Sequence, residues 1–125
     1  MLKPQSVPAK TLISELHEVL MCTKLSHYST KSFAQHEALG KTYDSINDLA
    51  DSITERILGY TNDTLTSFTF KEILPSPASM LGTKIIGLAE RLEKTSKENN
   101  WPDVENLAQE LSGVGAQLSY LGRFN

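Results

Sequence analysis

Apolar residues recur along this chain at steps of three and four, the spacing that gathers them on one face of an α-helix. They do so in four separate stretches, and we predict helices over residues 8–28, 32–59, 79–99 and 101–122. The second stretch is the longest, and its apolar stripe consists of Leu39, Tyr43, Ile46, Ala50, Ile53 and Ile57. Four such helices in 125 residues predict an all-α four-helix bundle that forms one domain, residues 1–125.

Residues that favour helix ends mark the boundaries of these stretches. Ser, Thr and Asn side chains can accept a hydrogen bond from the first free backbone amides of a helix, and Gly often follows its last turn. We expect Gly59 just past the second helix. The N-caps expected for the second, third and fourth helices are Ser32 or Thr30, Ser79 or Ser76, and Asn100.

The connection over residues 60–78 is longer than a simple loop between neighbouring helices usually is in a domain of this size. It is long enough to cross the bundle from end to end, which would make the second and third helices parallel. Its apolar side chains should be buried from solvent, so we expect a short helical turn over residues 70–74 at a dimer surface. A strand is excluded because no second strand is available to pair with it. The apolar side chains in question are Phe68, Phe70, Ile73 and Leu74.

Composition narrows the class of protein. Apolar residues make up 39% of the chain, a lean share that fits a protein completed by oligomerisation. No apolar run approaches the length of a membrane span, and no secretory signal is expected. The single cysteine, Cys22, excludes an internal disulfide and fits a cytoplasmic location. The net charge is −3 and the lysines are scattered, so the charge pattern argues against DNA binding.

A second face of the 32–59 helix carries candidate metal ligands. His36, Asp51 and Glu55 share about 100° of arc with Gly40 and Asn47. One imidazole and two carboxylates are donors that suit a divalent metal. His36 and Asp51 lie about 22 Å apart along the helix, so they cannot form one site within one chain.

Two antiparallel copies of this helix would bring His36 and the two carboxylates together. A two-fold axis near Asp44 would bring His36 of one copy to Asp51 and Glu55 of the other, and would build the site twice. Gly40 would let the two helices approach closely. His17 has no partner in this pattern, and we expect it on the surface.

His36, with Asp51 fifteen residues later and Glu55-Arg56 after it, resembles the ferroxidase motif of the Dps branch of ferritin-like proteins. The resemblance implies a ferritin-like bundle with the long crossover between the second and third helices. It also implies His27 as a further ligand, with Tyr28 in the place where the group usually has Trp. The spacing between the two histidines is shorter here than is usual. Residues 30–40 are also similar to small phage-encoded ferritin-like proteins, for which the host cytoplasm or the virion would be the location.

The resemblance further implies a function. Iron would bind to His27 and His36 of one copy and to Asp51 and Glu55 of its mate, in a homo-oligomer formed through antiparallel pairing of the second helices. Oxygen or peroxide could then oxidise the iron. Two alternatives remain open: a metal-free structural or interaction oligomer, phage-encoded or virion-associated, and a protein that holds another divalent metal, such as zinc or manganese, without redox turnover.

Overall fold

The computed structural model describes residues 8–124, which form four α-helices and no strand. The helices are α1 (Ala9–Ser29), α2 (Phe33–Thr61), α3 (Ala78–Asn99) and α4 (Pro102–Leu121). The predicted class and number of helices are confirmed, and every predicted boundary lies within two residues of the observed one. None of the described helices combines the length and hydropathy needed to cross a bilayer.

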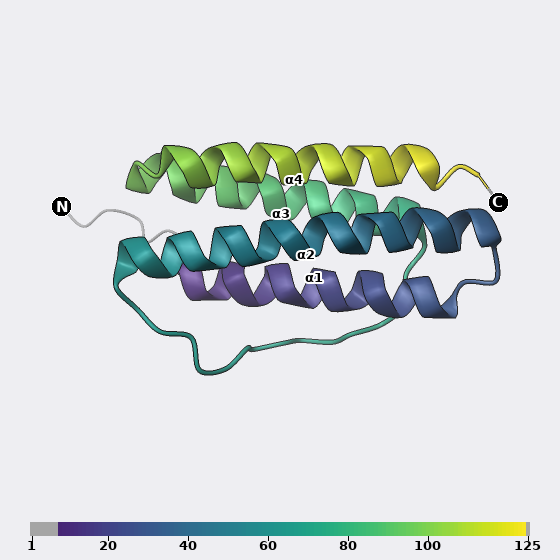
Figure 1. Cartoon of the computed structure of the whole chain (residues 1–125), viewed down its shortest axis with the longest axis horizontal. Coiled ribbons are helices and arrows are strands. Elements are labelled where there is room, and N and C mark those ends of the chain that lie inside the picture. The colour runs from purple at the N-terminus through teal and green to yellow at the C-terminus, as the bar shows by residue number, and fades with distance from the viewer. Residues whose placement is uncertain (1–7, 125) are drawn as a thin grey trace.

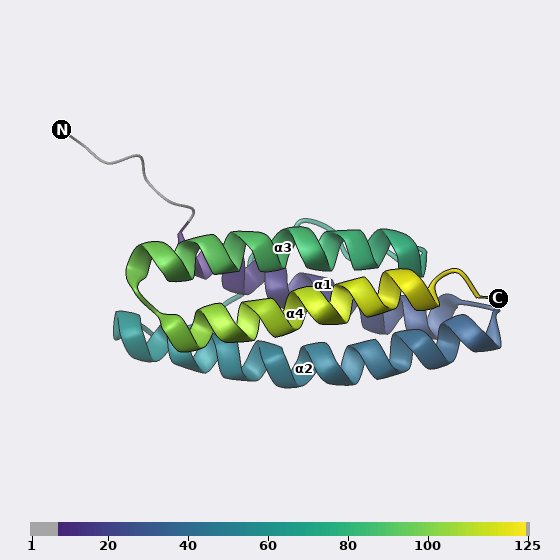
Figure 2. The same cartoon turned by 90° about the horizontal axis from the view of Figure 1, so that it is seen from above.

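The bundle consists of two antiparallel hairpins, α1 with α2 and α3 with α4, packed on each other (Figures 1 and 2). Contacts between the hairpins are made mainly by α2 with α4 and by α1 with α3, so α2 and α3 lie on a diagonal. The connection between α2 and α3 runs from one end of the bundle to the other along the outside of α1. Consequently α2 and α3 run in the same direction.

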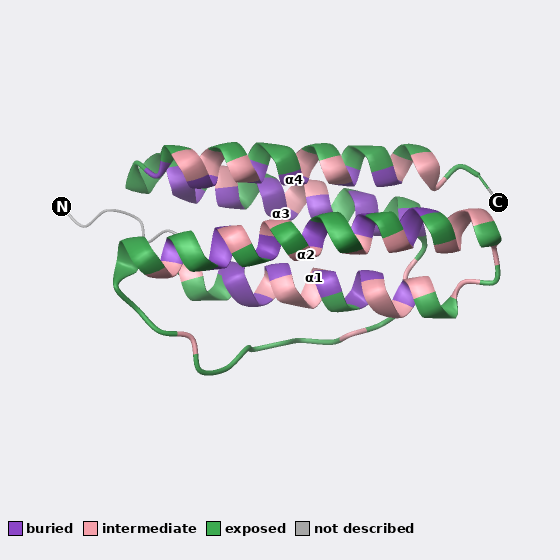
Figure 3. Ribbon diagram, viewed as in Figure 1, coloured by how far each residue is buried: buried purple, intermediate pink, exposed green. Residues whose placement is uncertain are grey.

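All four helices contribute side chains to one core, and Figure 3 shows their buried faces turned toward the centre. Each fully buried Leu or Ile in this core contributes about 1.5–3 kcal/mol relative to an exposed one. Trp101 is 8% exposed and stacks on Tyr60 with ring centroids 5.3 Å apart. It closes one end of the bundle. The fully buried residues include Leu12, Leu16, Ile46, Ile53, Leu81, Ile85, Leu88 and Leu111.

The backbones of α3 and α4 approach most closely where Gly82 faces Gly115. A Cβ on Gly115 would lie 2.9 Å from both the Gly82 carbonyl oxygen and the Ile85 Cγ2. A Cβ on Gly82 would lie 2.7 Å from the Gly115 carbonyl oxygen. Such distances are shorter than real Cβ contacts, so these two glycines set the separation of the helices.

The crossover, residues 62–77, is held along one side of α1 by side chains at steps of four and eight residues. Ser14 Oγ accepts a hydrogen bond from the Thr69 amide at 3.0 Å, and Ser26 Oγ accepts one from the Ser76 amide at 2.9 Å. Between them, one carboxylate oxygen of Glu18 accepts from the amides of Lys71 and Glu72. This polar stripe of α1 supplies the crossover amides with the hydrogen-bond acceptors that a helix or a sheet would otherwise provide.

Several local predictions for the crossover are wrong. Residues 70–74 form no helical turn, and Phe68, Phe70 and Leu74 are 44%, 36% and 52% exposed. Ile73 is partly buried against the core, as expected. Because α1 already satisfies several backbone amides of this segment, it has no need to form a helix.

The predictions for the helix ends are partly confirmed. Ser32 Oγ accepts from the Gln35 amide at 3.2 Å and caps α2. Gly59 does not end α2, which continues until Asn62 adopts the left-handed conformation at φ 53°. Pro77, without a side-chain bond, precedes α3 in place of a serine cap. Asn100 ends α3 at φ 58° instead of capping α4, because Asn tolerates this conformation better than most residues.

Candidate metal centre

Two histidines stack on each other where the end of α1 meets the start of α2. The rings of His27 and His36 have centroids 3.9 Å apart and planes inclined by 15°. Both side chains are half-buried. His27 Nδ1 lies 2.7 Å from the His36 carbonyl oxygen, and His36 Nδ1 lies 2.9 Å from the His27 carbonyl oxygen. The two residues therefore hold each other through reciprocal bonds.

These bonds assign the protons on the two rings. A carbonyl oxygen can only accept, so Nδ1 of each ring carries the hydrogen. In the neutral imidazole the other nitrogen, Nε2, then has a free lone pair. A hydrogen bond from Nδ1 to a backbone carbonyl is the arrangement that orients histidines for metal binding through Nε2. The pair thus offers two pre-oriented nitrogen donors.

Gly40 makes room for this pair. A Cβ at residue 40 would lie 2.8 Å from Cε1 and 3.2 Å from Nδ1 of His27. The space that we expected to admit a second copy of the helix is thus occupied by a histidine ring of the same chain. Gly40 therefore has a role within one copy, one that sequence reasoning did not anticipate.

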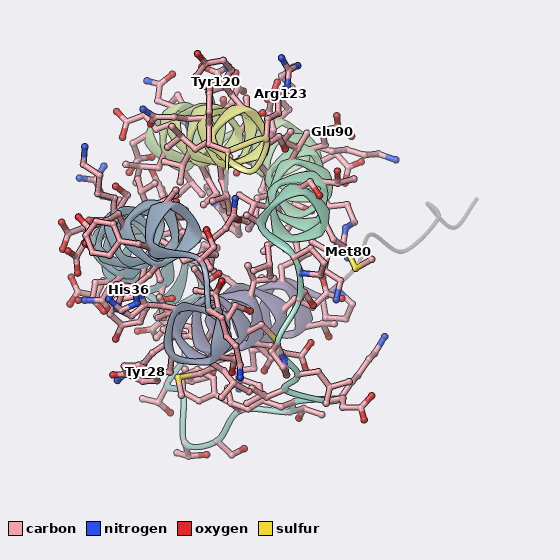
Figure 4. The ribbon with its side chains drawn as sticks, turned by 90° about the vertical axis from the view of Figure 1, so that its right-hand side faces the viewer. Tyr28, His36, Met80, Glu90, Tyr120 and Arg123 are labelled. Atoms are coloured by element: carbon pink, nitrogen blue, oxygen red, sulfur yellow. The ribbon has the colours of Figure 1, made fainter. Side chains whose placement is uncertain are left out.

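The histidine pair lies at the edge of an open hollow of about 450 Å³ between α1 and α2. Lys24 lines the hollow and places its ammonium 5.3 Å from the centre of the Tyr43 ring. Tyr28 borders the hollow and is 68% exposed. Figure 4 shows Tyr28 and His36 on neighbouring helices at this end of the bundle. The site is thus open to solvent and to a second molecule.

The two carboxylates of the predicted site lie elsewhere on α2. Asp51 and Glu55 are both exposed, one helical turn apart, and lie about four and five turns from His36. Within residues 8–124 no three His, Cys, Asp or Glu side chains come close enough to hold a metal. One copy therefore presents two separate half-sets of donors: a pair of imidazoles and a pair of carboxylates.

His17 differs from our expectation of a surface residue. It is half-buried, its Nε2 lies 3.0 Å from Thr54 Oγ1, and its ring stacks on Phe68 at 4.5 Å. Burial lowers the pKa of His17, and the negative charge of Asp51 partly offsets this. His17 thus joins α1, α2 and the crossover beside the carboxylate half-set. Its sequence position, one residue past the core residue Leu16, gave no sign of these contacts.

Comparison with known proteins gives relatives but no activity. The chain is 28% identical over 101 residues to an "Uncharacterized 14.6 kDa protein in mobD-ri intergenic region" of Enterobacteria phage T4. The match covers 77% of this chain and 73% of that protein. No solved structure matches the chain. A family of unknown function, DUF5856, matches residues 27–121, so that its match begins at His27 and includes all four candidate ligands. The chain belongs to the DUF5856 family.

Proposed function

We propose that this protein is a ferritin-like protein of the Dps type that binds iron at sites shared between two copies. The observation that carries the proposal is the His27–His36 pair, in which both Nδ1 atoms are engaged and neither Nε2 atom has a hydrogen-bond partner among residues 8–124. Bonds of this kind from Nδ1 to a backbone carbonyl also orient the rings of metal-binding histidines. The course of the crossover, which makes α2 and α3 parallel, also agrees with a ferritin-like bundle.

The spacing of residues along α2 supports sharing between copies. In an antiparallel pair of α2 helices with a two-fold axis between Asp44 and Ser45, residue 36 lies level with residue 53 of the second copy. Asp51 and Glu55 of that copy are then two residues to either side, about 3 Å along the axis. Each pair of imidazoles therefore meets a pair of carboxylates. Two identical sites result, because the interface is isologous.

The carboxylates and the imidazoles have different roles in the proposed site. The carboxylates of Asp51 and Glu55 supply charge to bind a divalent cation, and the imidazoles of His27 and His36 fix its position. Iron is the substrate in this proposal. Two ferrous ions would supply the two electrons that, with two protons, convert one peroxide molecule into two waters; dioxygen is the other possible oxidant. Zinc or manganese could occupy the same donors without turnover.

The test mixes two inactive variants. His36→Ala and Asp51→Ala each remove one donor and so break one half-set, and each variant alone should bind no ferrous iron under anaerobic conditions. Mixed in equal amounts, they should regain one intact site per mixed dimer, because each copy keeps the half-set that the other lacks. Glu90→Ala, which removes an exposed carboxylate of α3, is the matched control and should bind as the wild type does. Failure of the mixture to bind iron would refute the shared site.

A metal-free interaction protein is the second candidate function, and one observation favours it. Large apolar side chains gather, largely exposed, at the end of the bundle where α1 and α4 end and α2 and α3 begin. Figure 4 views this end and shows Tyr28, Met80 and Tyr120 around its rim. An oligomer or a partner that covers this end would need no metal. The side chains are Tyr28, Phe33, Leu74, Met80, Tyr120 and Phe124.

A further inference from the structure

The face of α2 that would meet a second copy is strongly acidic. It carries five exposed carboxylates and one exposed lysine, a net charge of −4 per copy. None of these carboxylates is in an ion pair with another residue of the described part of the chain. Apolar side chains on this side are few, and Tyr43 is itself half-buried. The six charged residues are Glu37, Lys41, Asp44, Asp48, Asp51 and Glu55.

The antiparallel register tells us which charges would meet. Lys41 lies level with Asp48 of the second copy, so two favourable pairs form about the axis. Asp44 lies next to the axis and faces its own counterpart. The charge on the two faces together is then −8, and half of it lies within one Debye length of the two-fold axis, about 10 Å at 0.1 M salt. This net charge, which already includes the two lysines, opposes contact, and little apolar area is available to drive it.

We propose that dimer formation through α2 depends on metal, so that a divalent cation assembles the pair as it fills the shared sites. This rests on the proposed function above. The cation neutralises Asp51 and Glu55 where they meet the imidazoles of the second copy, and so removes the charge that keeps the copies apart. Without it, the same face keeps the protein monomeric at low salt.

Linkage makes this dependence quantitative. If metal tightens the dimer by some factor, the dimer tightens metal by the same factor. Coupling between sites is commonly about 5- to 150-fold, so the dimer dissociation constant should fall by at least about 5-fold on metal addition. The apparent metal affinity should also rise with protein concentration. Salt should promote the metal-free dimer, because it screens the repulsion.

Sedimentation velocity on the full chain tests the proposal, with EDTA in one arm and Co²⁺ in the other. We expect monomer in EDTA and dimer with Co²⁺. Asp44→Asn removes the charge next to the axis without touching a ligand, and should raise the fraction of dimer in EDTA. Glu90→Gln, an equal loss of charge on α3, should leave that fraction unchanged. Asp51→Asn, which removes a ligand as well as a charge, should show no increase in dimer when Co²⁺ is added.

The outcomes separate this proposal from the one on which it rests. If Co²⁺ binds but the dimer is equally tight in EDTA, metal-dependent assembly is refuted and the shared site stands. If Co²⁺ does not bind at any protein concentration, both fail. If Asp44→Asn and Glu90→Gln behave alike in EDTA, repulsion across α2 is not what keeps the copies apart, and the proposal is overturned.

Discussion

Substituting Gly40 by Ala should uncouple the histidine pair without unfolding the bundle. The new Cβ would lie 2.8 Å from His27 Cε1, whereas ordinary contact begins at 3.4 Å, so the ring must withdraw by about 0.6 Å. The bond from His27 Nδ1 to the His36 carbonyl oxygen is now 2.7 Å, and such a shift along it would leave a weak bond.

The energetic terms oppose each other. Ala is favoured over Gly in a helix interior by about 1 kcal/mol. Overpacking costs about 1–3 kcal/mol, and the weakened hydrogen bond costs about 1 kcal/mol more. The net expectation is a loss of about 1–3 kcal/mol in the free energy of unfolding. Because Nδ1 orients the ring, metal affinity should fall about 10- to 100-fold, the usual effect of losing such a bond.

Gly59→Ala is the matched control on the same helix. A Cβ at residue 59 meets nothing within 4 Å, so that variant should gain up to about 1 kcal/mol. Urea unfolding followed by circular dichroism measures both variants, and Co²⁺ titration measures the site. If Gly40→Ala is stabilised as much as Gly59→Ala and binds Co²⁺ as the wild type does, the His27 ring does not need the space above Gly40.

Two further predictions concern the contacts that join the crossover to the bundle. Glu18→Ala should leave the amides of Lys71 and Glu72 without their acceptor and lower the free energy of unfolding by about 1 kcal/mol. It should also speed proteolytic cleavage of residues 62–77, whereas the control Glu90→Ala should not. Unchanged cleavage of Glu18→Ala would show that the polar stripe of α1 does not hold the crossover. His17 has a lowered pKa when folded, so the unfolded state binds its proton first, and stability should fall as the pH drops below about 6.5. His17→Gln should lose that part of the difference between unfolding free energies measured at pH 7.5 and pH 5.5; an equal difference in both proteins would show that His17 does not contribute.

The sequence predicted the helices well because their stripes repeat over five or more turns. It also placed His36, Asp51 and Glu55 on a common side of α2, since that requires only helical periodicity. Local turn chemistry was less reliable. Gly59 carries a common end signal, yet α2 continues past it until Asn62 supplies the left-handed residue.

Contacts between distant segments could not be predicted from one sequence. The reciprocal bonds of His27 and His36 depend on how α1 and α2 meet, which no spacing encodes. The same holds for the polar stripe of Ser14, Glu18 and Ser26: its partners are backbone amides about fifty residues away, and backbone amides have no sequence signature. The contacts of His17 with Thr54 and Phe68 could not be predicted for the same reason.

Anaerobic ferrous iron binding, measured together with mass in solution, tests the central claim most directly. We expect two metal sites per dimer in the wild type, loss of both in Glu55→Ala, and retention of both in Glu90→Ala. A wild-type protein that binds no stoichiometric iron at any mass, or a Glu55→Ala variant that binds as the wild type does, would contradict the account and direct attention to the apolar end of the bundle.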